Sequence, residues 1–188
     1  MSSTRLPRGR HSLSREEVVA SQRERMLRGL ADAMADKGYV NTTVADVLRV
    51  AGVSRETFYQ QFESKLDCFL AAYDAAAAIV LARMDAGPGD WEAALGTYLR
   101  TLAAEWAFAR LFLLEVYAAG PEALQRRAEH QAAFVDRAEK MLKLDRFACE
   151  ALVAATGALV TARLAADDPE GLRALHEPLA DLARRLAG

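Results

Sequence analysis

A short segment of the chain gathers side chains that can hydrogen-bond to the edges of nucleic-acid bases. Residues 43–62 read TVADVLRVAGVSRETFYQQF, and the RETFYQ stretch within them is rich in such groups. The guanidinium fork of Arg55 suits guanine, and Glu56 and Gln60 are also able to hydrogen-bond in the major groove of DNA. These residue types predict base recognition if one helix presents them together on an exposed face.

The same segment predicts the element that would present them, which is a helix-turn-helix. Apolar residues with helical spacing precede a tight turn at residues 51–54, and Gly52 lets the chain turn sharply there. Val47, Leu48 and Phe58 are expected to lock the two short helices at a fixed angle. Such a lock leaves the other face of the second short helix free to enter a major groove.

An ordered set of residues around this segment resembles the DNA-binding domain of TetR-family transcription regulators. The resemblance covers roughly residues 14–70, and it implies a dimeric bacterial regulator with a helical ligand-binding domain. The residues that carry it are Gly38, Tyr39, Thr42, Thr43, Ala51, Gly52, Val53, Ser54, Thr57, Phe58, Tyr59, Phe62, Ser64 and Lys65.

The resemblance also implies roles for individual residues. Thr43 and Lys65 would contact phosphates, and the remaining positions would contact bases or the DNA backbone. Gln61 departs from the family pattern, because similar sequences often carry histidine there. The implied contacts of the second short helix are Ser54, Arg55, Glu56, Thr57, Tyr59, Gln60 and Gln61.

The N-terminal arm adds Arg5, Arg8 and Arg10 on a polar tail. Arms of this kind enter the minor groove or follow phosphates. The alternative is a solvated tail that makes no contact with DNA. The sequence leaves both interpretations open.

The whole chain has an all-α pattern of about nine helices. Serine and glutamate or aspartate form capping boxes at Ser14 and Ser64, and Gly38 supplies a stop. We expect a three-helix DNA-binding domain with its arm at residues 1–64, and a helical regulatory and dimerisation bundle at residues 65–188. A very apolar segment is expected to reach Tyr117, and Pro178 should kink or split the last helix, which begins at Pro169.

A stripe of small and apolar residues follows Arg146 and predicts a helix–helix contact. In TetR-like proteins the last two helices of each subunit form the dimer interface, and a two-fold dimer would place two reading helices on successive turns of a palindromic operator. Ordinary packing within one chain would produce the same stripe. The stripe consists of Ala148, Leu152, Ala155, Leu159, Ala162 and Ala166.

Aromatic residues of the C-terminal part predict an apolar cavity for a small effector, although such residues usually pack in a core. Glu115 lies in a very apolar run, so it must be solvated, paired with an arginine such as Arg110 or Arg126, or lining that cavity. His130 is expected at the surface or in ordinary packing. The predicted lining residues are Tyr73, Tyr98, Trp106, Phe112, Glu115, Tyr117 and Phe134.

Charge and composition exclude several other classes. The net charge of −2 divides into +3 over residues 1–65, with 11 basic against 8 acidic residues, and −5 over residues 66–188. Cys68 and Cys149 have no metal-ligand spacing, no phosphate-binding loop or nucleophile motif occurs, and the longest uncharged run, residues 151–162, is short for a bilayer. We therefore expect a cytoplasmic protein without cofactor or metal, and not an enzyme.

These observations favour a repressor that a small apolar or aromatic effector releases from DNA. Two alternatives remain open. One is a TetR-like regulator without a small-molecule effector, which a partner protein controls or which activates transcription. The other is an all-helical small-molecule binding protein.

Overall fold

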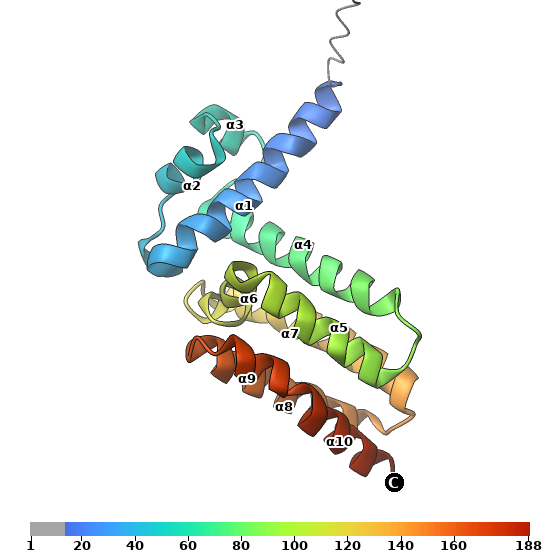
Figure 1. Cartoon of the computed structure of the whole chain (residues 1–188). Coiled ribbons are helices and arrows are strands. Elements are labelled where there is room, and N and C mark those ends of the chain that lie inside the picture. Colours follow the sequence, from blue (N-terminus) through green and yellow to red (C-terminus); the bar gives the residue numbers. More distant parts are fainter. Residues whose placement is uncertain (1–13) are drawn as a thin grey trace, which may run out of the picture.

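The computed structural model describes residues 14–188, apart from the side chains of Asp36 and Phe112, and this part of the chain forms only helices. Figure 1 shows α1–α3 at one end, α4 crossing beneath them, and the remaining helices stacked below. The elements are α1 (Arg15–Asn41), α2 (Val44–Ala51), α3 (Arg55–Tyr59), α4 (Lys65–Asp85), α5 (Trp91–Ala104), α6 (Trp106–Leu113), the 3-10 helix η1 (Glu115–Tyr117), α7 (Pro121–Leu142), α8 (Arg146–Ala165), α9 (Pro169–Ala174) and α10 (His176–Ala187).

The predicted helix-turn-helix is present as α2 and α3, packed against α1. Val47 and Phe58 are completely buried, so the two short helices are held by one core. Gly52 ends α2 in the left-handed region at φ 63°, which favours glycine. Arg25 of α1 donates to the carbonyls of Ala51 and Gly52 and holds the turn in place.

The predicted caps explain where these helices begin. Ser14 and Glu17 form a reciprocal capping box at the start of α1, with Oγ accepting from the Glu17 N–H at 3.1 Å. Ser64 caps α4 by accepting from the Asp67 N–H at 3.0 Å. The Asp67 carboxylate accepts from the Glu63 N–H rather than from Ser64, so this second box is not reciprocal.

Helix α4 joins the helix-turn-helix to the rest of the molecule. Its first half packs into the core of α1–α3 through Phe69 and Ala72, and its second half packs on α5 through Met84. Figure 1 shows α4 running between α1 above and α5 and α7 below. A movement of α4 would therefore affect both the packing of α1–α3 and the packing on α5.

The core of the second layer is built from α5, α7, α8 and α10. Leu95, Leu99, Leu152 and Leu179 are almost completely buried there. A largely separate core surrounds α1–α4. The two cores meet along α4 and α6.

Three boundaries differ from the expectations, and the described residues form ten α-helices and η1 rather than about nine helices. The expected helix from Trp91 to Phe108 breaks at Glu105, where the backbone leaves the helical region. The last segment splits at Leu175 and not at Pro178, because Pro178 falls in the first turn of α10, where no helical N–H is lost. Helix α1 contains its predicted break at Gly38 but resumes for one more turn.

Helix α8 is long and apolar enough to cross a membrane by length and composition alone, and its apolar window is only 28% buried within the chain. The sequence expectation relied on an uncharged run and did not identify this helix. Core helices of soluble proteins pass the same test. Phe147 is 79% exposed at the start of α8, so one face of this helix has no cover inside the chain.

Candidate functional site

The predicted reading face is assembled on α3. Arg55, Glu56, Tyr59 and Gln60 are all exposed, while Phe58 between them is buried. Gln60 Nε2 donates to Glu56 Oε1 at 3.4 Å, so these two side chains lie together one turn apart. The helix thus presents a polar surface of the kind that fits a major groove.

The start of α3 is fixed by two hydroxyls. Ser54 Oγ accepts from the Thr57 N–H at 3.0 Å and lies 2.9 Å from Thr57 Oγ1. Ser54 is exposed and Thr57 is partly buried, so both remain near the surface that would face DNA. Their observed role is to orient the N-terminus of α3.

Thr43 marks the start of α2, where a phosphate contact is predicted. Its hydroxyl donates to Asp46 Oδ2 at 2.6 Å, and Lys37 Nζ lies 2.7 Å from the same oxygen. The hydrogen bonds from Lys37 and Thr43 hold the pKa of Asp46 well below its usual range. Thr43 is exposed, but a phosphate would compete with Asp46 for its hydroxyl.

The ammonium group of Lys65 is turned inward, toward the end of α1. Nζ donates to the carbonyl of Tyr39 at 2.7 Å and to that of Thr42 at 2.8 Å, and it lies 4.0 Å from the centre of the Tyr39 ring. Burial lowers the pKa of Lys65. All these contacts fasten α4 to the end of α1 and give Lys65 a positioning role, while its phosphate contact stays a prediction.

Gln61 also lies differently from the prediction. Its side chain is partly buried against α1, where Nε2 donates to the Val19 carbonyl at 3.5 Å and Oε1 is buried without a partner. Arg23 of α1 donates to the Gln61 carbonyl and stacks over Phe62. This side chain supports the end of α3 more than it faces outward. Arg5, Arg8 and Arg10 lie outside the described residues.

Glu115 lies at the junction between the two cores, where it lines a cavity of about 170 Å³ together with Gly38 and Arg110. Its Oε2 accepts from the backbone N–H of Tyr39 at 2.7 Å. Gly38 permits this approach, because its φ is 73° and a Cβ there would lie 3.1 Å from Oε2. Sequence reasoning missed this contact, since 76 residues separate the two partners.

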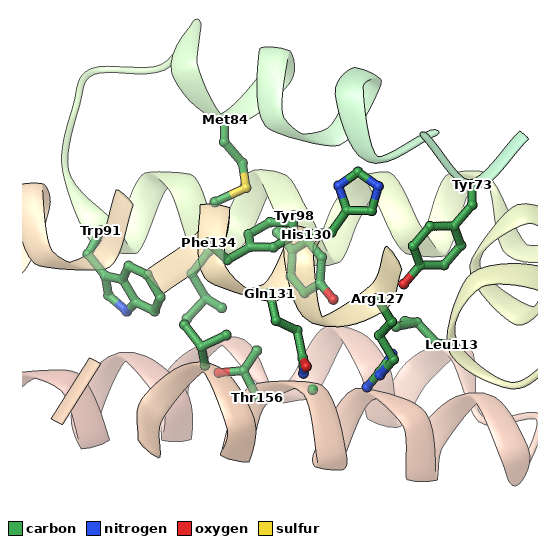
Figure 2. A pocket seen from close by; sticks show the side chains of 13 residues that line it. Tyr73, Met84, Trp91, Tyr98, Leu113, Arg127, His130, Gln131, Phe134 and Thr156 are labelled. Atoms are coloured by element: carbon green, nitrogen blue, oxygen red, sulfur yellow. The ribbon is translucent and has the colours of Figure 1, made fainter. Parts of the chain in front are cut away.

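A cavity of about 80 Å³ lies between α4, α5, α7 and α8 and contains three of the predicted residues, Tyr73, Tyr98 and Phe134. Figure 2 shows Trp91 on its left, with Tyr73 and Arg127 toward the right. His130 also lines it, and its Nε2 lies 2.8 Å from Asp74 Oδ1, so this partly buried histidine is packed inside the chain rather than at the surface, which are the two environments that we expected.

The other predicted lining residues lie elsewhere. Trp106 donates from Nε1 to Asp167 Oδ1 at 3.0 Å at the far end of α8. Tyr117 is 56% exposed and lies under the Arg127 guanidinium. The Phe112 side chain lies outside the described part of the chain. Trp106 and Tyr117 were predicted to line the effector cavity, but neither borders this one.

Several lining residues were missed by the sequence analysis. Among them, Arg127 and Gln131 share one face of α7 with the predicted Phe134, because the three are spaced by four and three residues. This spacing was visible in the sequence, but the aromatic residues alone were taken as the signal. Opposite them, α8 contributes Thr156 and Gly157.

The residues of the predicted dimer stripe on α8 differ in how far the chain itself buries them. Leu152 is 1% exposed in the chain's own core, so it is not available to a second copy. Leu159, Ala162 and Ala166 are exposed, whereas Ala148 and Ala155 are partly covered. The uncovered face is defined by the exposed apolar residues of α8, beside which Glu150 and Arg163 are also exposed. These apolar residues are Phe147, Ala151, Ala154, Ala158, Leu159, Ala162 and Ala165.

We expect Lys65→Ala to lower the free energy of unfolding by about 1.5–3 kcal/mol, because a charged donor to two carbonyls is lost. The salt dependence of DNA binding should stay unchanged, since a lost phosphate contact would lower the log–log slope by about 0.9. Urea unfolding and binding at several salt concentrations measure the two effects. Lys140→Ala, an exposed lysine of α7, is the control, and a lower slope for Lys65→Ala alone would support the predicted phosphate contact.

We expect Glu115→Ala to cost about 1–3 kcal/mol of unfolding free energy, because the Tyr39 N–H loses its acceptor at a partly buried position. Chemical denaturation measures the change. The exposed Glu16→Ala is the control and should alter stability by less than about 0.5 kcal/mol. Equal stability of the two variants would contradict the junction described above.

Comparison with known proteins agrees with this geometry. Residues 27–72 match the model of the bacterial regulatory proteins of the tetR family, a segment that contains α2, α3 and the start of α4. No curated protein sequence matched the chain.

Solved structures extend the likeness to the whole fold. The regulator FadR from Bacillus subtilis, solved in complex with stearoyl-CoA, has a TM-score of 0.74 at 19% identity, over 85% of this chain and 96% of that one. A TetR-family regulator from Streptomyces coelicolor has a TM-score of 0.70 at 19% identity, over 90% and 97%. One from Marinobacter aquaeolei has 0.62 at 21% identity, over 89% and 96%. The helix-turn-helix segment thus matches the bacterial regulatory proteins of the tetR family, and the all-helical fold is similar to that of solved TetR-family regulators.

Proposed function

We propose that the protein is a homodimeric repressor that binds a palindromic operator and is released by a small, largely apolar effector. The observation that carries this proposal is the exposed polar face of α3, held by the buried Val47 and Phe58. We assign residues 1–64 to DNA binding and residues 65–188 to effector binding and dimerisation. As a regulator of this kind it would act in the cytoplasm and catalyse no reaction.

Base recognition is assigned to the exposed residues of α3. Arg55 stands at the first position of the helix, where side chains reach base edges most easily, and its fork suits guanine. Glu56 and Gln60 would contact neighbouring bases, and the Tyr59 hydroxyl would contact a phosphate. Five helical residues offer few contacts, so one copy alone would bind weakly.

A second copy supplies the missing affinity and is assigned to the uncovered face of α8. That face is apolar and built mainly of alanines, so two α8 helices could approach closely around a two-fold axis. An uncovered apolar face of this length is unusual for a monomer in water. The dimer would place two α3 helices about 34–36 Å apart on successive major-groove turns.

The effector is assigned to the cavity between α4, α5, α7 and α8. At about 80 Å³ this cavity is smaller than the few hundred Å³ of an ordinary ligand pocket, so an occupant must push its walls apart. FadR from Bacillus subtilis binds stearoyl-CoA in a related fold, which supports a ligand of apolar character here. Displacement of a wall helix by the effector could in turn be transmitted to the DNA-binding helices.

Helix α4 provides the connection from cavity to DNA. Tyr73 of the cavity stacks on Phe69 at 6.2 Å between ring centres, and Phe69 packs edge-on against Tyr39 at 5.2 Å. Lys65 and Glu115 hold the same Tyr39. An effector that prefers a displaced α4 would change the spacing of the two α3 helices and release DNA by its difference in affinity for the two states.

Selection of bound DNA from a random library tests the function directly, and it should yield a palindromic site. For that site we expect Arg55→Ala to weaken binding by about 10- to 100-fold and to relax the preference at one base pair. Tyr59→Phe should weaken binding without altering thermal stability. Arg100→Ala, an exposed arginine of α5, is the control. If no preferred DNA sequence is recovered, the alternative of a helical small-molecule binding protein would be favoured.

The dimer is tested by placing a charge on the uncovered face of α8. We expect Ala158→Arg to convert the dimer to a monomer, because an arginine would be buried without a partner at the close approach. Sedimentation velocity measures the mass. Ala82→Arg, an exposed alanine of α4, should leave the dimer intact. A dimeric Ala158→Arg protein would place the interface elsewhere.

A further inference from the structure

We propose that the effector is an amphipathic anion, whose acidic group binds Arg127 and Gln131 above Gly157 and whose apolar body enters the cavity. This inference rests on the effector site of the proposed function and names the chemical class of its ligand. It depends on three features: a convergence of donors, an uncompensated charge, and an apolar opposite end.

The donors converge because α7 and α8 leave a gap at one position. A Cβ at Gly157 would lie 3.8 Å from both Arg127 Nη2 and Gln131 Nε2. Arg127 and Gln131 are one helical turn apart, so a guanidinium and an amide stand side by side over the single glycine of α8. An oxygen-rich anion accepts from such paired donors, and guanidinium is particularly suited to a carboxylate.

The charge of Arg127 has no counter-charge in the described part of the chain, where no carboxylate lies within ion-pair distance of it. Its neighbour Arg126 is different, because it pairs with Asp74 and lies 3.1 Å from Glu129. Arg127 contacts the Tyr117 ring and the hydroxyl of Tyr73. Burial raises the pKa of Tyr73, and this guanidinium lowers it in part. A partly buried cation beside a cavity favours an anionic occupant.

The end of the cavity opposite Arg127 is mostly apolar, and its polar atoms include Trp91 Nε1, which is buried there without a partner among the described residues. In Figure 2, Met84, Phe134 and Trp91 lie to the left of Gln131, away from Arg127. A hydrocarbon or aryl group placed there would be removed from water while the acidic group stays at the Arg127 side. The two halves of the site thus match a molecule with one charged and one apolar end.

The small volume indicates how such a ligand would fit. A cavity of about 80 Å³ holds only part of a medium-length chain, so the walls must yield. Met84 is an unbranched, flexible side chain in the wall, and it belongs to α4. Its displacement would push on the helix that leads to Tyr39.

Paired probes with and without the charge test the inference. Octanoate is compared with 1-octanol, and 4-butylbenzoate with 4-butylbenzyl alcohol, by calorimetry and by fluorescence. Trp106→Phe makes Trp91, which lines the cavity, the only tryptophan in the chain. We expect at least one acid to bind tenfold or more tightly than its alcohol, and to weaken binding to the selected operator.

Two variants locate the charged group. Arg127→Gln should abolish the preference for the acid and leave the affinity for the alcohol within about twofold. Gly157→Ala should weaken the acid, because a methyl group fills the gap between the donors, and it should fold well because alanine favours helices. Arg173→Gln, on the surface of α9, should change nothing.

The results separate this inference from the proposed function. Equal binding of acid and alcohol, no binding of either acid, or an acid preference that survives Arg127→Gln would overturn the anion site. If operator selection succeeds while both acids fail, the inference fails and DNA-binding regulation stands. If an acid binds through Arg127 while no operator is selected, the site stands and the regulatory function fails.

Discussion

The backbone of Tyr39 is held from two sides by charged side chains, and the arrangement of the two halves of the molecule depends on it. Glu115 accepts its N–H, and Lys65 donates to its carbonyl. Glu115 belongs to η1, and Lys65 is the first residue of α4. Because both bonds are charge-assisted and partly shielded, they are among the stronger contacts that a junction of this size can have.

Helix α4 makes contacts at both of its ends, one set at this junction and the other at the cavity. Near one end, Met84 borders the cavity, and at the other, Lys65 is fastened to the last turn of α1. The rings of Tyr73, Phe69 and Tyr39 fill the space between. A packed interior does not deform smoothly, so displacement of α4 residues at the cavity would tend to move the whole helix as one rigid unit.

The sequence predicted the features that depend on local order. Ser14, Thr43 and Ser54 cap the expected helices, and Gly52 turns the chain, because each acts within a few residues. The observed contacts of Lys65 and Glu115 were not predicted, since their partners come from distant segments and no periodicity reports them. The cavity was predicted in part: aromatic type identified Tyr73, Tyr98 and Phe134. The helical spacing of Arg127 and Gln131 with Phe134 was present in the sequence, but their approach to Gly157 depends on how α7 packs against α8.

The uncovered face of α8 links the amount of protein to its activity. If a second copy closes that face, as we propose, the dimer population rises with the square of the monomer concentration when protein is scarce. Occupancy of a two-fold operator would then respond more steeply to gene expression than a monomeric binder could. In the proposed dimer, the alanine face would thus also set a protein concentration below which the operator is left open.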